Sequence, residues 1–119
     1  MALTPAAVRK HCLSFPGASV NLQWGKDHVF KVGGKMFAVI GLSDAGRFLG
    51  MSFKAAPDSF VILTQLPGIV PAPYLARAQW VALDKLSALP AAELKAYLRR
   101  AYDIVASGLP KSVQRKLAG

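Results

Sequence analysis

The spacing of apolar residues in the first fifteen positions predicts a helix. Thr4 is a typical N-cap residue, and Pro5 fits the first helical position. The apolar residues that follow recur at helical spacing, at Val8, Cys12 and Phe15. Pro16-Gly17 is a helix-breaking pair, so we expect the helix to end at Phe15.

Residues 18–24 alternate between apolar and polar side chains and therefore predict a strand. Its apolar face comprises Val20, Leu22 and Trp24, and the shared face makes Trp24 a core residue. The best-defined local pattern is a hairpin, because residues 29–32 and 35–40 are strand-like and flank the two-residue loop Gly33-Gly34.

A two-residue loop fixes the partners in this hairpin. It places Val32 opposite Lys35 and Phe30 opposite Phe37. Phe30, Val32, Phe37 and Val39 then share one face, which we expect to be the core face.

The rest of the chain continues with turns, strands and helices. We expect a turn at 44–46, a strand over 47–54, a helix that begins near Pro57 with a stripe of Phe60, Leu63 and Leu66, a proline-rich extended loop over 67–76, and a strand over 79–83. The clearest helix begins after Pro90, ends near Gly108, and has one apolar stripe formed by Leu94, Tyr97, Leu98, Ala101, Tyr102 and Val105. A short turn or helix follows Pro110. The order helix, meander of about four strands, helix, strand, helix predicts one α+β domain over residues 1–119, with a mostly antiparallel sheet and helices on one face.

Composition narrows the class of protein. The 119 residues suit one domain, and 53% hydrophobic residues exclude disorder as the main state. The apolar runs are far shorter than the ~20 residues of a spanning helix, so we expect no membrane association. The start shows no secretory signal pattern, and a single Cys suits a reducing compartment, so we expect a cytoplasmic protein.

Charge is the strongest global signal, because 15 Lys and Arg against 6 Asp and Glu give a net charge of +9. Such a surface attracts nucleic acid, anionic lipid or acidic proteins, although a solvated exterior explains a basic helix equally well. Residues 85–119 are the most basic third, with seven basic and two acidic residues. The candidate phosphate contacts are Lys31, Lys35, Lys54, Arg77, Arg99, Lys111, Arg115 and Lys116.

Catalytic or metal chemistry finds little support. The six acidic residues are scattered, and no pair can be placed together from spacing. A site formed by His11, Cys12 and His28 is conceivable, but the spacing of a zinc motif is absent. Gly33-Gly34-Lys35 does not fit a phosphate-binding Walker loop, because the two glycines join two strands. We therefore expect no enzyme, no catalytic residues, no cofactor and no metal.

Two other function classes stay open. A protein-interaction module, with a homodimer among its forms, would use the proline-rich loop 67–76 with Tyr74 and the neighbouring Trp80. A small-ligand site or enzyme would need a pocket near Tyr74, Arg77, Trp80 and Lys54. Trp80 itself could stack a base if it is exposed, or could pack on the long helix.

Several segments together resemble the MmcQ/YjbR family of small bacterial proteins. They are GKDHVFKVGGKMFAVI, FKAAP, VPAPYLARAQWVAL and AYDIVASGLPKSVQRKL, and the resemblance covers nearly the whole chain. It implies a compact α+β fold, often described as frataxin-like or secretion-chaperone-like, and it implies the label of a DNA-binding protein without catalytic residues. Iron binding of the frataxin type needs carboxylates on the first helix and strand, and residues 1–25 contain none. We thus expect a non-catalytic DNA-binding protein that contacts phosphates with little sequence specificity.

Overall fold

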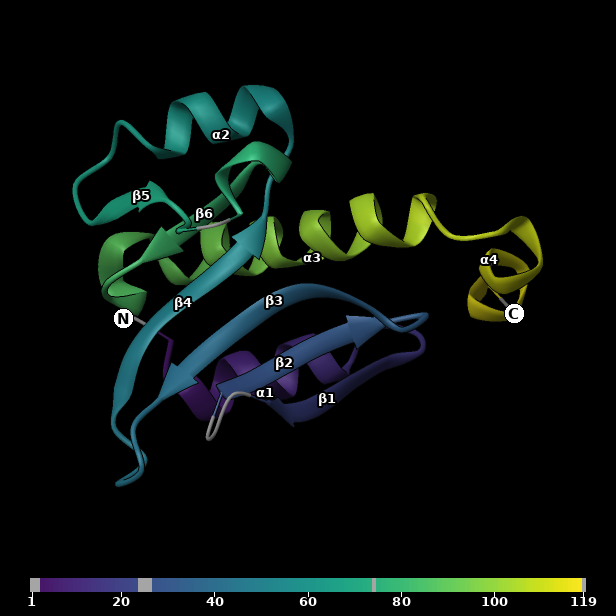
Figure 1. Ribbon diagram of the computed structural model, residues 1–119, viewed down its shortest axis with the longest axis horizontal. Helices are drawn as coiled ribbons and strands as arrows, with labels where there is room; N and C mark the ends of the chain where they lie inside the picture. Colours follow the sequence, from purple (N-terminus) through teal and green to yellow (C-terminus); the bar gives the residue numbers. More distant parts are fainter. Residues whose placement is uncertain (1–2, 24–26, 74, 119) are drawn as a thin grey trace.

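The chain forms an open antiparallel sheet with helices behind it (Figure 1). The computed structural model describes residues 3–23, 27–73 and 75–118. Its elements are α1 (Pro5–Leu13), β1 (Ala18–Gln23), β2 (Asp27–Val32), β3 (Lys35–Leu42), β4 (Phe48–Lys54), α2 (Pro57–Leu63), β5 (Ile69–Pro71), η1 (Ala76–Ala78), β6 (Trp80–Leu83), η2 (Leu86–Ala88), α3 (Ala91–Ser107) and α4 (Lys111–Ala118). The strand order β1-β2-β3-β4-β6-β5 confirms the predicted α+β class and the four-strand meander.

The β2–β3 hairpin turns through Gly33 and Gly34, whose φ angles are +58° and +81°. A two-residue turn of this hand requires positive φ at both positions, which glycine adopts without strain. The predicted pairing of Val32 with Lys35 is confirmed.

The predicted pairing of Phe30 with Phe37 is wrong, because a β-bulge interrupts the hairpin. Lys31 pairs with Met36 and Phe30 with Ala38, so Phe37 is an extra residue between them. Phe37 and Ala38 are both fully buried, while Val39 is only partly buried and turns to the other side of the sheet. The bulge thus places one more large aromatic side chain in the core than a regular ladder would.

The core lies between one face of the sheet and helices α1 and α3, which are seen behind the strands in Figure 1. The predicted stripe of α3 is confirmed, since Leu94, Leu98, Ala101 and Tyr102 are buried. The first helix ends at Leu13 rather than at Phe15 as predicted, because the chain already turns at Ser14. Phe15 lies just beyond α1 and joins it to α3 and the sheet, with its ring 5.1 Å from that of Tyr102 and 6.0 Å from that of Phe37. Burial of these large rings supplies much of the hydrophobic stabilisation.

Two expectations near the sheet edges need correction. Leu22 is 65% exposed, because β1 is an edge strand and no element of the described chain covers its end. Trp24, expected beside it in the core, lies outside the described residues. Leu66 lies beyond the end of α2 and is 39% exposed, so only Leu63 of the predicted stripe is buried and Phe60 is half-buried.

The proline-rich segment forms a strand that the sequence did not predict. Ile69–Pro71 pairs with β6 in antiparallel register, with Val70 opposite Ala82. β6 therefore lies between β4 and β5, and β5 becomes the second edge of the sheet. In the described part of the chain, no helix combines the length and the hydropathy needed to cross a membrane.

Candidate nucleic-acid interface

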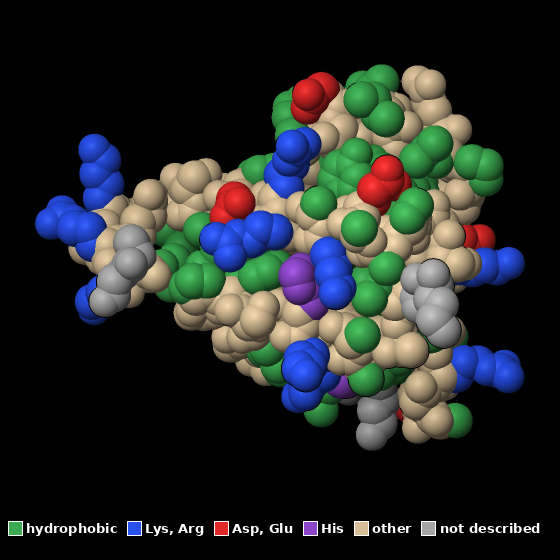
Figure 2. Space-filling view, turned by 180° about the vertical axis from the view of Figure 1, so that it is seen from behind, with side chains coloured by type: hydrophobic (Ala, Val, Ile, Leu, Met, Phe, Trp, Pro, Cys, Tyr) green, Lys and Arg blue, Asp and Glu red, His purple; other side chains and the backbone are tan. Residues whose placement is uncertain are grey.

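One face of the sheet is covered by helices α1 and α3, and we call the other face the open side of the sheet. Helices α1, α3 and α4 present most of the exposed basic side chains on the side of the molecule opposite this open side. We call this side the helix face; its exposed basic residues are Arg9, Lys10, Lys95, Arg99, Arg100, Lys111, Arg115 and Lys116. Figure 2 shows Lys and Arg side chains spread across this side, with few acidic ones among them. Only Glu93 and Asp103 on these three helices are acidic. The helix face is therefore the most positively charged side of the described structure.

Arg99 is held in place near the middle of α3. Its Nε donates a hydrogen bond to Oδ1 of Asp103 at 3.1 Å, one helical turn away. Its guanidinium lies 5.3 Å from the ring centre of Phe15 and 5.1 Å from that of Tyr102, as in cation–π contacts. Arg99 keeps half of its side chain exposed, so it can still reach an external anion.

A cleft of about 350 Å³ opens beside Arg99, between α3, Pro16 and α4. We call it the α3–α4 cleft; its lining comprises Pro16, Arg99, Tyr102, Ala106, Ser107, Gln114 and Leu117. The Tyr102 hydroxyl donates to the Pro16 carbonyl, so this hydrogen bond joins two of the lining residues. Burial is the main cause that raises the pKa of Tyr102, so this hydroxyl stays protonated at neutral pH.

Two contacts fix α4 at the edge of this cleft. The Gln114 side-chain amide donates to the carbonyls of Ser107 and Leu109, at 3.1 and 2.7 Å, where α3 leaves carbonyls without helical partners. Leu117 packs closely against Gly17, since a β-carbon added to Gly17 would lie 2.2 Å from Cδ2 of Leu117. The basic side chains of α4 are thus carried on a helix that is held at its middle, by Gln114, and at its last turn, by Leu117.

The hairpin predicted to contact phosphates divides between two sides of the molecule. Its turn packs against Leu109, since a β-carbon on Gly33 would lie 2.6 Å from Leu109 Cδ1. Lys35 therefore lies at the same end of the molecule as α4, beside the α3–α4 connection (Figure 1). Lys31 neighbours the core residues Phe30 and Val32 in β2, so its side chain points to the opposite, open side of the sheet.

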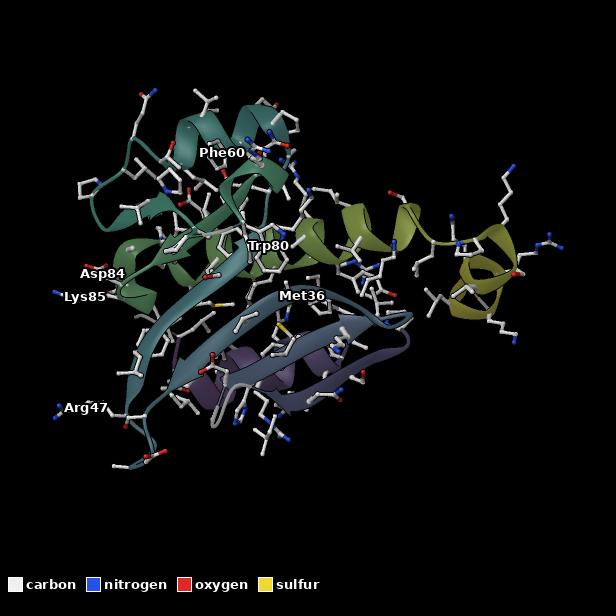
Figure 3. The ribbon with its side chains drawn as sticks, in the orientation of Figure 1. Met36, Arg47, Phe60, Trp80, Asp84 and Lys85 are labelled. Atoms are coloured by element: carbon white, nitrogen blue, oxygen red, sulfur yellow. The ribbon has the colours of Figure 1, made fainter. Side chains whose placement is uncertain are left out.

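The candidates Lys54 and Arg77, and two basic residues that were not candidates, lie away from α4. The Lys54 ammonium group donates to the Ala78 carbonyl, and this bond ties β4 to η1. Arg77 is exposed on η1. Arg47 and Lys85, together with Asp84, point outward at the end of the molecule opposite α4 (Figure 3).

Trp80 is 4% exposed, so it offers no ring face for stacking a base. Its neighbour Val81 faces the core, and Trp80 therefore lies on the side of the sheet away from α3 (Figure 3). The expectation that it packs on the long helix is also wrong, because Trp80 sits opposite Lys54 on the open side. Tyr74, the other candidate of the interaction surface, lies outside the described residues.

The open side of the sheet holds a shallow groove of about 500 Å³. Its lining is mostly apolar, and includes Val39, Leu49, Val70, Pro73 and Ala82. Asp27 and Asp84 also line it, and their carboxylates would repel phosphate. Arg77, Trp80 and Lys54, expected around a ligand pocket, do not line this groove.

The conceivable His11–Cys12–His28 site does not form. His11 Nε2 donates to the carbonyl of Lys95 at 3.2 Å, so it links α1 to α3. Cys12 is fully buried, and burial raises the pKa of its thiol to about 12. Within residues 3–23, 27–73 and 75–118, no three His, Cys, Asp or Glu side chains are close enough to hold a metal ion.

The structure thus places Arg99 beside the cleft that α4 borders, and the hairpin turn that carries Lys35 against the α3–α4 connection. Lys31, Lys54 and Arg77 lie elsewhere. Sequence reasoning missed Arg9, Lys10, Lys95 and Arg100. The helical spacing of Val8, Cys12 and Phe15 contained the signal for the first two, because it leaves Arg9 and Lys10 on the outer side of α1.

Comparisons with known proteins find a family match and two solved structures with this fold. The model of the YjbR family matches residues 13–104. The crystal structure of the Deinococcus radiodurans protein DR2400, which has a DUF419 domain, superposes with a TM-score of 0.82 and 26% identity, over 97% of this chain and 88% of that one. A Pseudomonas syringae protein has the same fold, with a TM-score of 0.68 and 17% identity over 87% of this chain and 99% of its own. No functionally curated protein matches the chain significantly.

Proposed function

The chain belongs to the YjbR family, and from this premise we propose that it binds duplex DNA through phosphate contacts on the helix face, without base readout and without catalysis. The α3–α4 end would make the densest contacts, through Lys35, Arg99 and the basic residues of α4. Such contacts provide affinity that depends strongly on salt and weakly on sequence.

One observation carries the proposal: the basic side chains of the helix face are exposed and almost all lack an acidic partner. α1 and α4 contain two and three basic residues and no acidic ones. Among the residues described, the Arg99–Asp103 contact is the one ion pair. Basic side chains without a partner remain available to neutralise phosphates and to release counterions.

Duplex DNA is favoured over single strands because the aromatic rings beneath Arg99 are buried. Proteins that grip single strands commonly stack bases on exposed aromatic rings. The rings of Phe15 and Tyr102 are 5% and 4% exposed, so the helix face presents neither of them to a base. The regular spacing of phosphates along a duplex suits a face that bears only charge.

The test is fluorescence anisotropy with labelled duplex DNA, single-stranded DNA and heparin, at ~50 and ~200 mM salt. We would compare the variant Lys111→Gln/Arg115→Gln/Lys116→Gln with the matched control Arg47→Gln/Arg77→Gln/Lys85→Gln. Both variants lose three positive charges, but the control removes them from other parts of the molecule.

The two variants should differ if α4 contacts phosphates. The α4 variant should lose most of the affinity for the duplex, and its slope of log K against log salt should fall by about 2–3. The control variant should keep the duplex affinity and the salt slope of the wild type. Equal losses in the two variants, or equal binding of duplex and heparin, would mean that net charge alone attracts polyanions, and the proposal would then be wrong.

A second function, docking of a protein partner, is favoured by a separate observation. Of the six large apolar side chains that are most exposed in the described chain, four lie in residues 61–70: Val61, Ile62, Leu66 and Val70. This patch adjoins the proline-rich segment where the sequence suggested an interaction surface. A purified partner that binds the wild type and the Leu49→Lys control, but not Ile62→Lys, would support this function; binding to all three would contradict it.

A further inference from the structure

The two edges of the sheet are built differently. β5 has three residues and ends at Pro71, and short length and proline both protect an edge from pairing with other strands. β1 has six residues, Ala18–Gln23, without a proline or a charged side chain, and it pairs with β2 without a bulge. In a chain with 15 basic residues, an edge strand without a single Lys or Arg is unusual.

The backbone of β1 has hydrogen-bonding groups directed away from the sheet. The two-residue hairpin makes Val32 and Lys35 a hydrogen-bonded pair, so the groups of Val32 and Phe30 point to β3 and those of Lys31 and Val29 point to β1. Ser19 and Asn21, which pair with Lys31 and Val29, therefore use the β1–β2 ladder.

The groups of Ala18, Val20 and Leu22 alternate with these and point outward. The Ala18 amide confirms this direction, since it donates to the Phe15 carbonyl outside the ladder, at 3.1 Å. Within the described residues, Val20 and Leu22 have no backbone hydrogen bond beyond the strand ladder. Their amide and carbonyl groups form a free template for another strand.

We propose that β1 pairs with β1 of a second copy of this chain, antiparallel and about a two-fold axis, so that two sheets become one. The register that uses the outward groups places Val20 opposite Val20 of the partner subunit, and Leu22 opposite Ala18 of the partner subunit. In this register Val20 exchanges two hydrogen bonds with its symmetry mate, and each Leu22 amide donates to an Ala18 carbonyl.

The side chains of this register are complementary to themselves. Ala18, Val20 and Leu22 share the face of β1 that is turned toward the helices. Leu22 is 65% exposed in the single chain, and the small side chain of Ala18 leaves it room across the seam. The pairing therefore covers the largest exposed apolar side chain on this edge.

Charge favours a second copy at this edge over contact elsewhere. Each copy has a net charge of +9, so most surfaces of two copies repel each other. β1 brings no charges directly opposite one another, since Ala18–Gln23 contains none. α1 packs on β1 and bears Arg9 and Lys10, so some repulsion remains near the seam, and salt should strengthen the dimer. The proposal is independent of DNA binding.

Sedimentation velocity over about 10 µM to 1 mM protein, at low and high salt, tests the proposal. We would compare the wild type with Leu22→Lys and with the control Leu49→Lys. Leu49 is 63% exposed on β4, so the control makes the same substitution at the same exposure away from the seam. Thermal unfolding followed by circular dichroism verifies that both variants are folded.

The wild type should form dimers that are tighter at high salt. Leu22→Lys should raise the dimer dissociation constant about tenfold or more, because the change occurs twice in each dimer. Leu49→Lys should match the wild type, and the Val20 and Leu22 amides should exchange more slowly with solvent in the wild-type dimer. A wild type that stays monomeric at every concentration, or equal effects of the two variants, would overturn the proposal; the first result would leave this edge to an extended segment of another protein.

Discussion

The contact between the hairpin turn and Leu109 can be tested with two neighbouring glycines. Gly33 and Gly34 both have positive φ, at +58° and +81°. A β-carbon on Gly34 would have no atom within 4 Å, whereas one on Gly33 would lie 2.6 and 2.9 Å from the two methyl groups of Leu109. The substitutions Gly33→Ala and Gly34→Ala therefore share the backbone cost and differ in the steric one.

The magnitudes follow from these two terms. Alanine in the left-handed region costs about 1 kcal/mol, so Gly34→Ala should lower the free energy of unfolding by about that amount. Leu109 is 6% exposed and belongs to the core, so its methyl groups have little room to move aside. Overpacking adds about 1–3 kcal/mol, and Gly33→Ala should therefore cost about 2–4 kcal/mol.

Urea denaturation of the two single variants, of Leu109→Ala and of the double variant Gly33→Ala/Leu109→Ala closes a thermodynamic cycle. Leu109→Ala removes the methyl groups in question, so in its background Gly33→Ala should cost only about 1 kcal/mol, as at Gly34. Equal costs for the two glycine substitutions, or an unchanged cost of Gly33→Ala without the Leu109 methyls, would refute the close packing of the hairpin turn against the α3–α4 connection.

Three further predictions concern single side chains. The buried Cys12 thiol should resist iodoacetamide at pH 8 until the protein unfolds. Burial raises the pKa of this thiol from its ordinary value of 9.0 to about 12, so the stability that it contributes should be complete below pH 9 and be lost as the pH rises toward 12. The variant Cys12→Ala should lack this pH dependence of the free energy of unfolding. Thr4→Ala should lower the free energy of unfolding by about 1 kcal/mol in urea, because the Thr4 hydroxyl accepts from the Ala7 amide at 3.1 Å, whereas Thr4→Ser should retain it. Tyr102→Phe should cost about 1–2 kcal/mol in the same assay, because it leaves the Pro16 carbonyl without its donor, and an unchanged midpoint would show that water replaces the hydroxyl.

Local chemistry was enough to predict the elements whose signals lie within a few residues. Thr4 caps α1 as expected, the two glycines turn the β2–β3 hairpin, and the stripe from Leu94 to Tyr102 is buried in α3. In each case the residues that determine the conformation are adjacent or lie one helical turn apart.

The wrong predictions concern features that depend on distant parts of the chain. The bulge at Phe37 accompanies a contact with Phe15, whose ring lies 6.0 Å away and 22 positions earlier in the chain, so local periodicity does not contain it. β5 is a strand because β6 presents a free edge to it, although Pro71 argues against a strand. The exposure of Leu22 follows from the edge position of β1, and periodicity contains no information on strand order.

The candidate interface was predictable only where its residues are neighbours in the sequence. The basic character of α4 could be read from Lys111, Arg115 and Lys116, because they are near neighbours on one short helix. The separation of Lys31 from Lys35 could not, since it depends on the side of the sheet that the helices cover. The structural use of Lys54 required the position of η1, 24 residues further along the chain.

The contacts between the two ends of the chain have a consequence for synthesis on the ribosome. Phe15 packs on Tyr102, His11 donates to the carbonyl of Lys95, and Gly17 meets Leu117. The meander can pair while the chain is being made, because its strands are joined by short turns. The first helix, however, emerges long before the residues that bury it, and the apolar side of the meander stays uncovered until α3 appears. The nascent chain therefore carries exposed apolar surface while the meander is being made, and the core is covered only after α3 has emerged.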